Sequence, residues 1–115
     1  MEAKTLFDKI WDSHVVDSIE NGPDILYIDQ HYIHEVTSPQ AFTGLAQRNI
    51  SLFRPEKTLA TADHNIPTKN QHLPIVEELS RIQVKTLTQN CEKYGVKLYG
   101  LNHPFNGIVH VIGAE

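Results

Sequence analysis

Two polar segments of this sequence carry the side chains best suited to proton transfer. The first holds Asp63 and His64 and follows the apolar run 58–62, and the second, residues 102–110, ends on His110. An imidazole gives and takes protons near neutral pH, and a neighbouring carboxylate fixes its tautomer and orientation. Because ligands of alternating α/β chains bind where strands end, we expect Asp63, His64 and His110 to converge on one pocket and to perform acid–base chemistry there.

Each of these histidines also has a plainer interpretation. Adjacent residues on a strand point to opposite faces, so Asp63 and His64 can cooperate only at a strand end or in a loop, where they could equally form a polar cap. His110 lies inside the apolar run 108–112, where a histidine is more often a hydrogen-bonded core residue than a catalyst. The polar residues 102–106 just before it favour the catalytic interpretation.

A third polar stretch precedes a predicted helix. His34 and Glu35 stand just before residues 37–39, Thr-Ser-Pro, which are typical of a helix start with a hydroxyl cap and a proline in the first turn. Free N–H groups at a helix start favour anions, so a substrate carboxylate would fit there. Asp29, His31 and His34 could instead ligate zinc or iron, but their spacing matches no strong metal signature.

Hydrophobic spacing predicts an alternating order of helices and strands. Helices are expected over residues 6–14, from 37 onward and over 75–94, and strands over 25–28, 58–62, 96–99 and 108–112. Thr5 and Asp8 form a capping box before the first helix, and Gly95 ends the third. The third helix has an apolar face made of Ile75, Val76, Leu79, Ile82, Leu87, Cys91 and Tyr94. This order predicts a three-layer α/β/α fold with a mainly parallel sheet.

The bulk composition excludes several classes of protein. The 115 residues are 40% hydrophobic and 21% charged, which is typical of one globular domain. The net charge is -4 and no cluster of Lys and Arg occurs, which argues against nucleic-acid binding. No apolar run is long enough to cross a bilayer. Cys91 is the only cysteine, so an internal disulfide is excluded and we expect a reducing, cytoplasmic location.

Five segments, taken together, resemble the aconitase superfamily, and within it the branch that acts on isopropylmalate. They keep their order along essentially the whole chain, at residues 4–10, 26–29, 34–42, 61–65 and 101–110. No single segment is specific to this superfamily, but five segments that occur in the same order are. The resemblance implies that residues 1–115 are the N-terminal part of an aconitase-like large-subunit α/β domain, and that the whole protein is several times longer.

The resemblance also implies a reaction and the groups that assist it. Members of this branch are hydro-lyases that isomerise 2-isopropylmalate to 3-isopropylmalate by dehydration and rehydration in leucine biosynthesis, and a homoaconitate-type substrate is the near alternative. They hold a [4Fe-4S] cluster through three later cysteines, with its open iron as a Lewis acid, and a separate small subunit supplies a serine base. Cys91 matches no cluster ligand, so we expect this chain alone to bind no cluster and no other metal, and to be inactive.

Four residues match active-site positions of the family. The resemblance implies that His64 gives a proton to the leaving hydroxyl while Asp63 holds its ring, that His110 is a further active-site histidine, and that His34 replaces a substrate-binding glutamine. Two other functions remain open: a non-catalytic binding or regulatory module on the same scaffold, and a small metal hydrolase that uses His31, His34 and Asp63.

Overall fold

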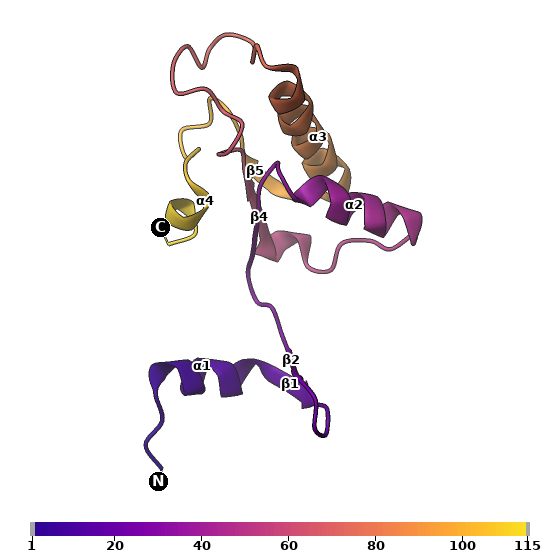
Figure 1. The fold of residues 1–115 in the computed structure, drawn as a ribbon, viewed down its shortest axis with the longest axis vertical. Helices are drawn as coiled ribbons and strands as arrows, with labels where there is room; N and C mark the ends of the chain where they lie inside the picture. Colours follow the sequence, from indigo (N-terminus) through magenta and orange to yellow (C-terminus); the bar gives the residue numbers. More distant parts are fainter. Residues whose placement is uncertain (1, 115) are drawn as a thin grey trace.

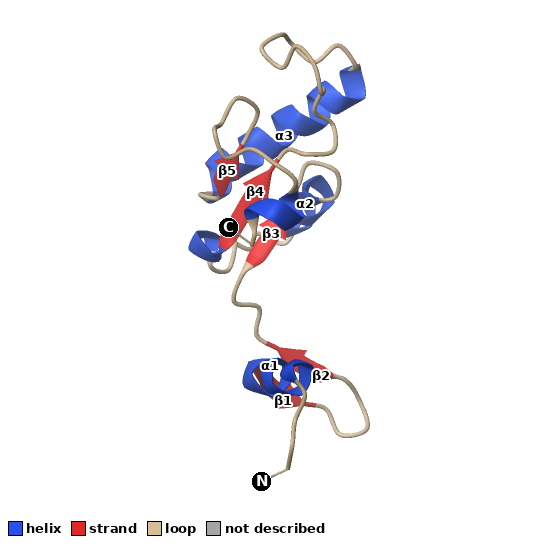
Figure 2. Ribbon diagram, turned by 90° about the vertical axis from the view of Figure 1, so that its left-hand side faces the viewer, coloured by secondary structure: helices blue, strands red, loops and turns tan. Residues whose placement is uncertain are grey.

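The chain folds into two parts of different character (Figure 1). The computed structural model describes residues 2–114. We call residues 2–30 the N-terminal unit and residues 31–114 the α/β body. Figures 1 and 2 both show the unit standing clear of the body, and its last residues, 27–30, form an extended linking segment between the two. The radius of gyration is accordingly 17.5 Å, against about 13 Å for a compact chain of this length.

Local signals build the N-terminal unit. Helix α1 (Leu6–His14) starts at the predicted capping box, because the Thr5 hydroxyl accepts the Asp8 N–H and the Asp8 carboxylate accepts the Thr5 N–H. Strands β1 (Val15–Ser18) and β2 (Asp24–Leu26) follow as an antiparallel hairpin. The capping box is therefore confirmed, and the hairpin was not predicted.

The strand expected over residues 25–28 is wrong in its extent and its partner. Only its first two residues lie in β2, which pairs with β1 in the hairpin instead of joining the parallel sheet. Ile25 and Ile28 are exposed. The chain reverses at Asn21, which adopts the left-handed conformation with φ 56°, and so brings β2 onto its immediate neighbour. A short apolar run looks the same in the sequence whether it forms a strand of an exposed hairpin or a strand of a buried sheet.

A three-stranded parallel sheet forms the centre of the α/β body. Its order is β3-β4-β5, so the middle strand is paired on both sides. In chain order the elements of the body are β3 (His31–Ile33), α2 (Ser38–Gln47), the 3₁₀ turn η1 (Pro55–Lys57), β4 (Thr58–Thr61), α3 (Glu78–Tyr94), β5 (Lys97–Tyr99) and α4 (Val109–Ile112). Helices α2 and α3 are thus the two crossover connections.

Both crossover helices lie on the same face of this sheet. They contact each other, and the four-residue α4 lies on the opposite side (Figure 1). The cause is topological: right-handed crossovers place every helix on one face when a parallel sheet grows in one direction. The described residues therefore form the expected mixed α/β fold with a small parallel sheet, and they contain one principal helical layer instead of two.

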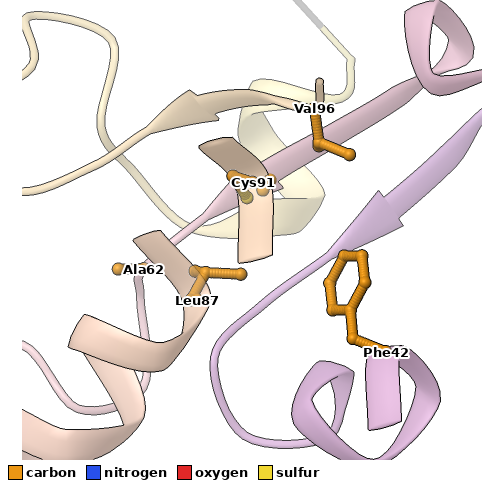
Figure 3. Close-up of a cluster of buried hydrophobic side chains, with 6 residues drawn as sticks. Phe42, Ala62, Leu87, Cys91 and Val96 are labelled. Carbon is orange, nitrogen blue, oxygen red and sulfur yellow. The ribbon is translucent and has the colours of Figure 1, made fainter. Parts of the chain in front are cut away.

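The buried core lies where β4 meets these two helices (Figure 3). It consists of Phe42, Ala60, Ala62, Leu87, Cys91 and Val96. Leu87 is completely buried, and burial of a leucine side chain contributes about 1.5–3 kcal/mol. Burial also raises the pKa of the Cys91 thiol to about 12. Cys91 is therefore a core residue, as its place on the apolar face of the helix indicated.

Helix α3 begins three residues later than its apolar pattern predicts. The Glu77 carboxylate caps it by accepting two N–H groups of the first turn. Ile75 and Val76 consequently stay outside the helix, and Val76 is 93% exposed. Of the seven residues of the predicted apolar face, Leu87 and Cys91 alone are buried. The buried residues of α3 therefore lie in the C-terminal half of the helix only.

Other helix boundaries follow their sequence signals in part. Pro39 lies in the first turn of α2, and Gly95 ends α3 in the left-handed conformation with φ 72°, as predicted. The expected hydroxyl cap of α2 is wrong, because Thr37 has helical backbone angles and its side chain makes no capping hydrogen bond. None of the helices within residues 2–114 is long and apolar enough to span a membrane.

The strand expected over residues 108–112 is a helix instead. Helix α4 begins at Val109, whose N–H donates to the Oδ2 atom of Asp63 at 2.9 Å. The preceding loop turns back over the sheet at the left-handed Asn102 (φ 69°), and the Asn106 side chain donates to backbone carbonyls at the ends of β4 and β5. These long-range contacts outweigh the preference of β-branched residues for strands.

Candidate active site

The polar segments recognised in the sequence meet at one edge of the parallel sheet. His34 follows β3, Asp63 and His64 follow β4, and the loop 102–106 follows β5. Because the three strands are parallel, their carboxyl ends lie at the same edge. In open α/β sheets this is the edge at which ligands bind. The fold thus brings together polar residues that are far apart in the sequence.

Asp63 and His64 form a hydrogen-bonded pair at the end of the central strand. The Oδ1 atom of Asp63 and the Nδ1 atom of His64 are 2.5 Å apart. The Asp63 side chain is 6% exposed and the His64 side chain 49%, so a buried carboxylate holds one edge of a ring whose other edge reaches solvent. With Nδ1 engaged, Nε2 is the atom of His64 that can exchange a proton with a ligand.

The second oxygen of the Asp63 carboxylate binds the backbone of α4. It accepts the Val109 N–H at 2.9 Å, one residue before His110 in the same helix. Asp63 therefore caps a helix and orients an imidazole with the same side chain. The polar-cap interpretation is therefore correct for Asp63, and its catalytic role stays a prediction that the contact with His64 permits.

His34 packs against the ring of His64. The two ring centroids are 4.1 Å apart and the ring planes are inclined by 32°. The Val36 N–H donates to Nδ1 of His34 at 3.2 Å, and within residues 2–114 the Nε2 atom of this half-buried ring has no hydrogen-bond partner. Two imidazoles with free Nε2 atoms thus lie side by side at the strand ends.

Two open clefts flank this pair of rings. One, of about 540 Å³, is lined by Tyr32, His34, Val109, His110, Gly113 and Ala114. The other, of about 430 Å³, has His64 and Lys69 among its lining residues. The structure therefore brings His34 and His110 onto one cleft and places His64 on its neighbour, in contrast to the single pocket that we expected.

Glu35 is a residue of this site to which the sequence pattern assigned no role of its own. Its side chain is completely buried. Its carboxylate accepts three consecutive backbone N–H groups, those of Asp63 at 3.2 Å, His64 at 2.7 Å and Asn65. Hydrogen bonds to a charged group contribute about 1.5–3 kcal/mol each, and here they offset the several kcal/mol that burial of a carboxylate costs. An acidic residue before a helix was the only signal in the sequence.

A second polar network holds the loop after β5 over the strand ends. The Asn106 side chain donates to the carbonyl oxygens of Tyr99 at 2.8 Å and Ala62 at 3.0 Å, and the Thr61 hydroxyl donates to the backbone of the same loop at 2.9 Å. His103 stacks on Tyr99 with a centroid distance of 4.7 Å. The polar residues of this segment therefore have a structural role, since they hold the loop against the strand ends. The loop in turn positions α4 and His110.

The residues of this site do not fit an iron–sulfur cluster. His34, Glu35, Asp63 and His64 have ligand atoms within 4.8 Å of one another, but none of them is a thiolate and both carboxylates already accept N–H groups. Cys91 is buried in the core, and its thiol pKa is raised, whereas a metal ligand must be a thiolate. The chain therefore offers no cysteine to such a cluster.

The alternative metal trio of Asp29, His31 and His34 is not assembled in the described residues. Asp29 binds Nε2 of His14 at 2.8 Å within the N-terminal unit. His31 and His34 lie at opposite ends of β3. The Asp29 carboxylate accepts a hydrogen bond from the His14 ring and thereby raises the pKa of His14, which is a hydrogen-bonded structural residue, as its lack of a surrounding motif indicated.

Comparison with known proteins defines the class to which this site belongs. The model of the aconitase family (aconitate hydratase) matches residues 8–115, which is nearly the whole chain. The chain therefore belongs to the aconitase family. The resemblance carried by the five sequence segments is confirmed.

Curated relatives narrow the comparison to one enzyme. The chain is 64% identical over 112 residues to the 3-isopropylmalate dehydratase large subunit of Cytophaga hutchinsonii, covering 97% of this chain and 24% of that protein. The proteins of the same name from Flavobacterium johnsoniae and Bacteroides thetaiotaomicron are 58% and 56% identical, over 98% and 96% of this chain and 24% of each relative. The chain thus spans about a quarter of the length of these relatives. No solved structure gives a significant match.

Proposed function

We propose that this chain is part of the large subunit of a hydro-lyase that isomerises 2-isopropylmalate to 3-isopropylmalate in leucine biosynthesis. The relatives of 56–64% identity bear that enzyme's name. The observation that carries the proposal is the Asp63–His64 hydrogen bond at the carboxyl end of the central strand. In this proposal residues 1–115 are the N-terminal part of an α/β domain, and the rest of the whole protein supplies the second helical layer of a three-layer fold.

The reaction removes one water molecule and then returns it. The C–O bond of the substrate hydroxyl breaks, a base takes a proton from the neighbouring carbon, and a C=C bond forms between the two carbons. In our proposal the Nε2 atom of protonated His64 gives the proton that lets the hydroxyl leave as water. Asp63 holds the ring at Nδ1 throughout. Addition of water with the opposite regiochemistry completes the isomerisation.

We assign substrate binding and orientation to the cleft beside this pair. His34 lies three residues before Thr37, the N-cap of α2, where the N–H groups of the first turn favour an anion, and its Nε2 can donate to a substrate carboxylate. His110 lines the same cleft and would orient the substrate or relay a proton. A dicarboxylate that binds His34 in this cleft would have to extend across the packed rings of His34 and His64 into the neighbouring cleft to reach His64.

Two further components come from outside these residues in the proposal. A [4Fe-4S] cluster, which supplies a Lewis acid when bound, takes its cysteine ligands from the rest of the whole large subunit, because Cys91 is buried. A small subunit joins it as a heterodimer and brings the base that removes the carbon-bound proton. We also propose a cytoplasmic location and expect the 115-residue chain alone to be inactive.

The test uses the whole large subunit that carries this segment, assembled with its small subunit. His64→Ala should lower kcat by about 10²–10⁴-fold, the usual contribution of general acid catalysis, and should change KM little. His72→Ala is the matched control, because His72 is exposed in the loop before α3, and kcat should stay unchanged. A near-normal kcat in His64→Ala removes His64 from the mechanism. If the wild-type enzyme converts a homoaconitate-type acid and does not convert isopropylmalate, the substrate is the homoaconitate-type acid instead.

A further inference from the structure

The buried Glu35 carboxylate sits under the turn that carries the Asp63–His64 pair. Its Oε2 atom accepts the Asp63 N–H, and its Oε1 atom accepts the N–H groups of His64 and Asn65. No part of Glu35 reaches solvent. A fully buried carboxylate is retained only where its hydrogen bonds are made, and here three successive backbone amides make them.

We propose that Glu35 is the positioning residue that gives the Asp63–His64 pair its geometry, an inference that rests on the proposed function for its catalytic consequence. In an extended strand Asp63 and His64 would point to opposite faces of the sheet. Three successive N–H groups that converge on one anion form a concave turn instead. The turn allows the Asp63 Oδ1 atom to reach Nδ1 of His64, its immediate neighbour, at 2.5 Å.

The backbone is fixed by regular structure both before and after Glu35. Ile33 pairs with Ala60 in the parallel ladder, and Ser38 begins α2. The carboxylate is therefore carried by the turn between β3 and α2, and it fixes the end of β4 relative to the end of β3. His34, which follows Ile33 directly, is set against the His64 ring by the same arrangement.

The chemistry of the contact calls for glutamate at this position. Both carboxylate oxygens act as acceptors, so Glu35→Gln keeps the size of the side chain but turns one acceptor into an NH₂ donor that faces a backbone N–H. Glu35→Asp keeps the charge but shortens the side chain by one methylene. Each change should make the turn at Asp63 and His64 more mobile without creating a cavity in the hydrophobic core.

The first experiment is independent of the proposed function and uses the 115-residue chain. Amide hydrogen exchange and the ¹⁵N signals of the His64 ring are compared between wild type, Glu35→Gln and the control Glu92→Gln, which changes an exposed glutamate of α3. We expect the amides of residues 63–65 to exchange as slowly as those of β4 in wild type, and about ten-fold or more faster in Glu35→Gln. The His64 ring should pass from one tautomer to a mixture.

Fast exchange of these three amides in the wild-type chain would overturn the proposal, whatever the variants do. Should Glu35→Gln not fold, Glu35→Asp is the second variant, with the same expected loosening of the turn. A folded variant with unchanged exchange and an unchanged His64 tautomer also overturns the proposal. None of these outcomes depends on what reaction the whole protein catalyses.

The second experiment measures turnover in the whole large subunit assembled with its small subunit. Glu35→Gln should lower kcat by about 10- to 100-fold, the usual cost of misplacing a catalytic group, with KM within about three-fold. The double variant Glu35→Gln/His64→Ala should be no slower than His64→Ala, because Glu35 acts through His64. Multiplied losses in the double variant overturn the positioning role. A wild-type protein that does not isomerise isopropylmalate refutes the proposed function alone, and the exchange experiment still decides the role of Glu35.

Discussion

The N-terminal unit and the α/β body hold their polar groups in opposite ways. In the unit none of residues 2–30 is buried, and the polar contacts are surface pairs such as His14 with Asp29 and Trp11 with Asp24. In the body the Glu35 side chain is fully buried and that of Asp63 nearly so. Their carboxylates accept N–H groups from other segments of the chain.

This difference shows where the structure can tolerate the loss of a contact. Surface pairs contribute little, because water and salt screen them. A buried carboxylate costs several kcal/mol once a partner is removed. The apolar residues follow the same division: Leu6 and Phe7 of the unit are 74% and 67% exposed, whereas Leu87 of the body is 0% exposed. Changes in the body should therefore act globally, and changes in the unit locally.

The largest effect is expected in the core of the body. Leu87→Ala should lower the free energy of unfolding by about 2–5 kcal/mol, because it leaves a cavity in a fully buried site. Leu79→Ala is the control on the same helix, where the side chain is 70% exposed, and it should change stability by no more than about 0.5 kcal/mol. Urea denaturation followed by circular dichroism measures both. Equal losses in the two variants would contradict the described core.

A smaller and local effect is expected at the start of α1. Thr5→Ala removes the hydroxyl that accepts the Asp8 N–H, and the loss of such a cap costs about 1 kcal/mol. Amide exchange in α1 should become about five-fold faster, with no change in the body. The matched control is Thr37→Ala, because the Thr37 side chain makes no capping bond at α2. Faster exchange throughout the body would show that the two parts unfold together.

The smallest effect is expected from the His14–Asp29 pair of the unit. The Asp29 carboxylate accepts a hydrogen bond from the His14 ring and raises the pKa of His14 above 6.5, so folding favours the protonated ring. The stabilisation is therefore fully present below about pH 6.5 and is lost as the pH rises through the raised pKa. Wild type should be slightly more stable than Asp29→Asn at about pH 5 and equal to it at about pH 9.

The His14 ring signals should confirm the direction of this shift. In an NMR titration, the midpoint of His14 should lie above its ordinary value in wild type and return toward that value in Asp29→Asn. High salt should shrink the difference between the two proteins, since the Asp29 side chain is exposed and that of His14 is partly exposed. A midpoint unchanged by Asp29→Asn would remove this pair as a contact between α1 and the linking segment.

Several features that rest on neighbouring residues could be predicted, although the β1–β2 hairpin and the cap of α2 were not, and features that rest on distant contacts could not. The capping box at Thr5 and the stop at Gly95 involve residues within one turn, and both are present. Residues 108–112 carry a strand pattern, yet they form a helix because Asp63 accepts the Val109 N–H. Local preference was overruled there by a contact 46 residues away in the sequence.

The candidate site also contains some features that could be predicted from the sequence and others that could not. Asp63 and His64 stand out in the sequence because a carboxylate and an imidazole stand side by side after an apolar strand, and the structure joins them. The separation of His64 and His110 onto neighbouring clefts could not be read from spacing. It depends on how the His34 ring packs against His64 and on where α4 is held.

Sequence alone determined the chemistry available to this protein, its three longer helices and the strands near residues 58–62 and 96–99, because residue types and hydrophobic spacing are properties of the chain itself. The five ordered segments also determined its family, which the match over residues 8–115 confirms. Tertiary structure alone decided that Glu35 lies beneath the turn at Asp63 and His64. The physical reason is that a buried carboxylate is satisfied by backbone N–H groups, which every residue except proline carries, so no side-chain pattern marks its partners.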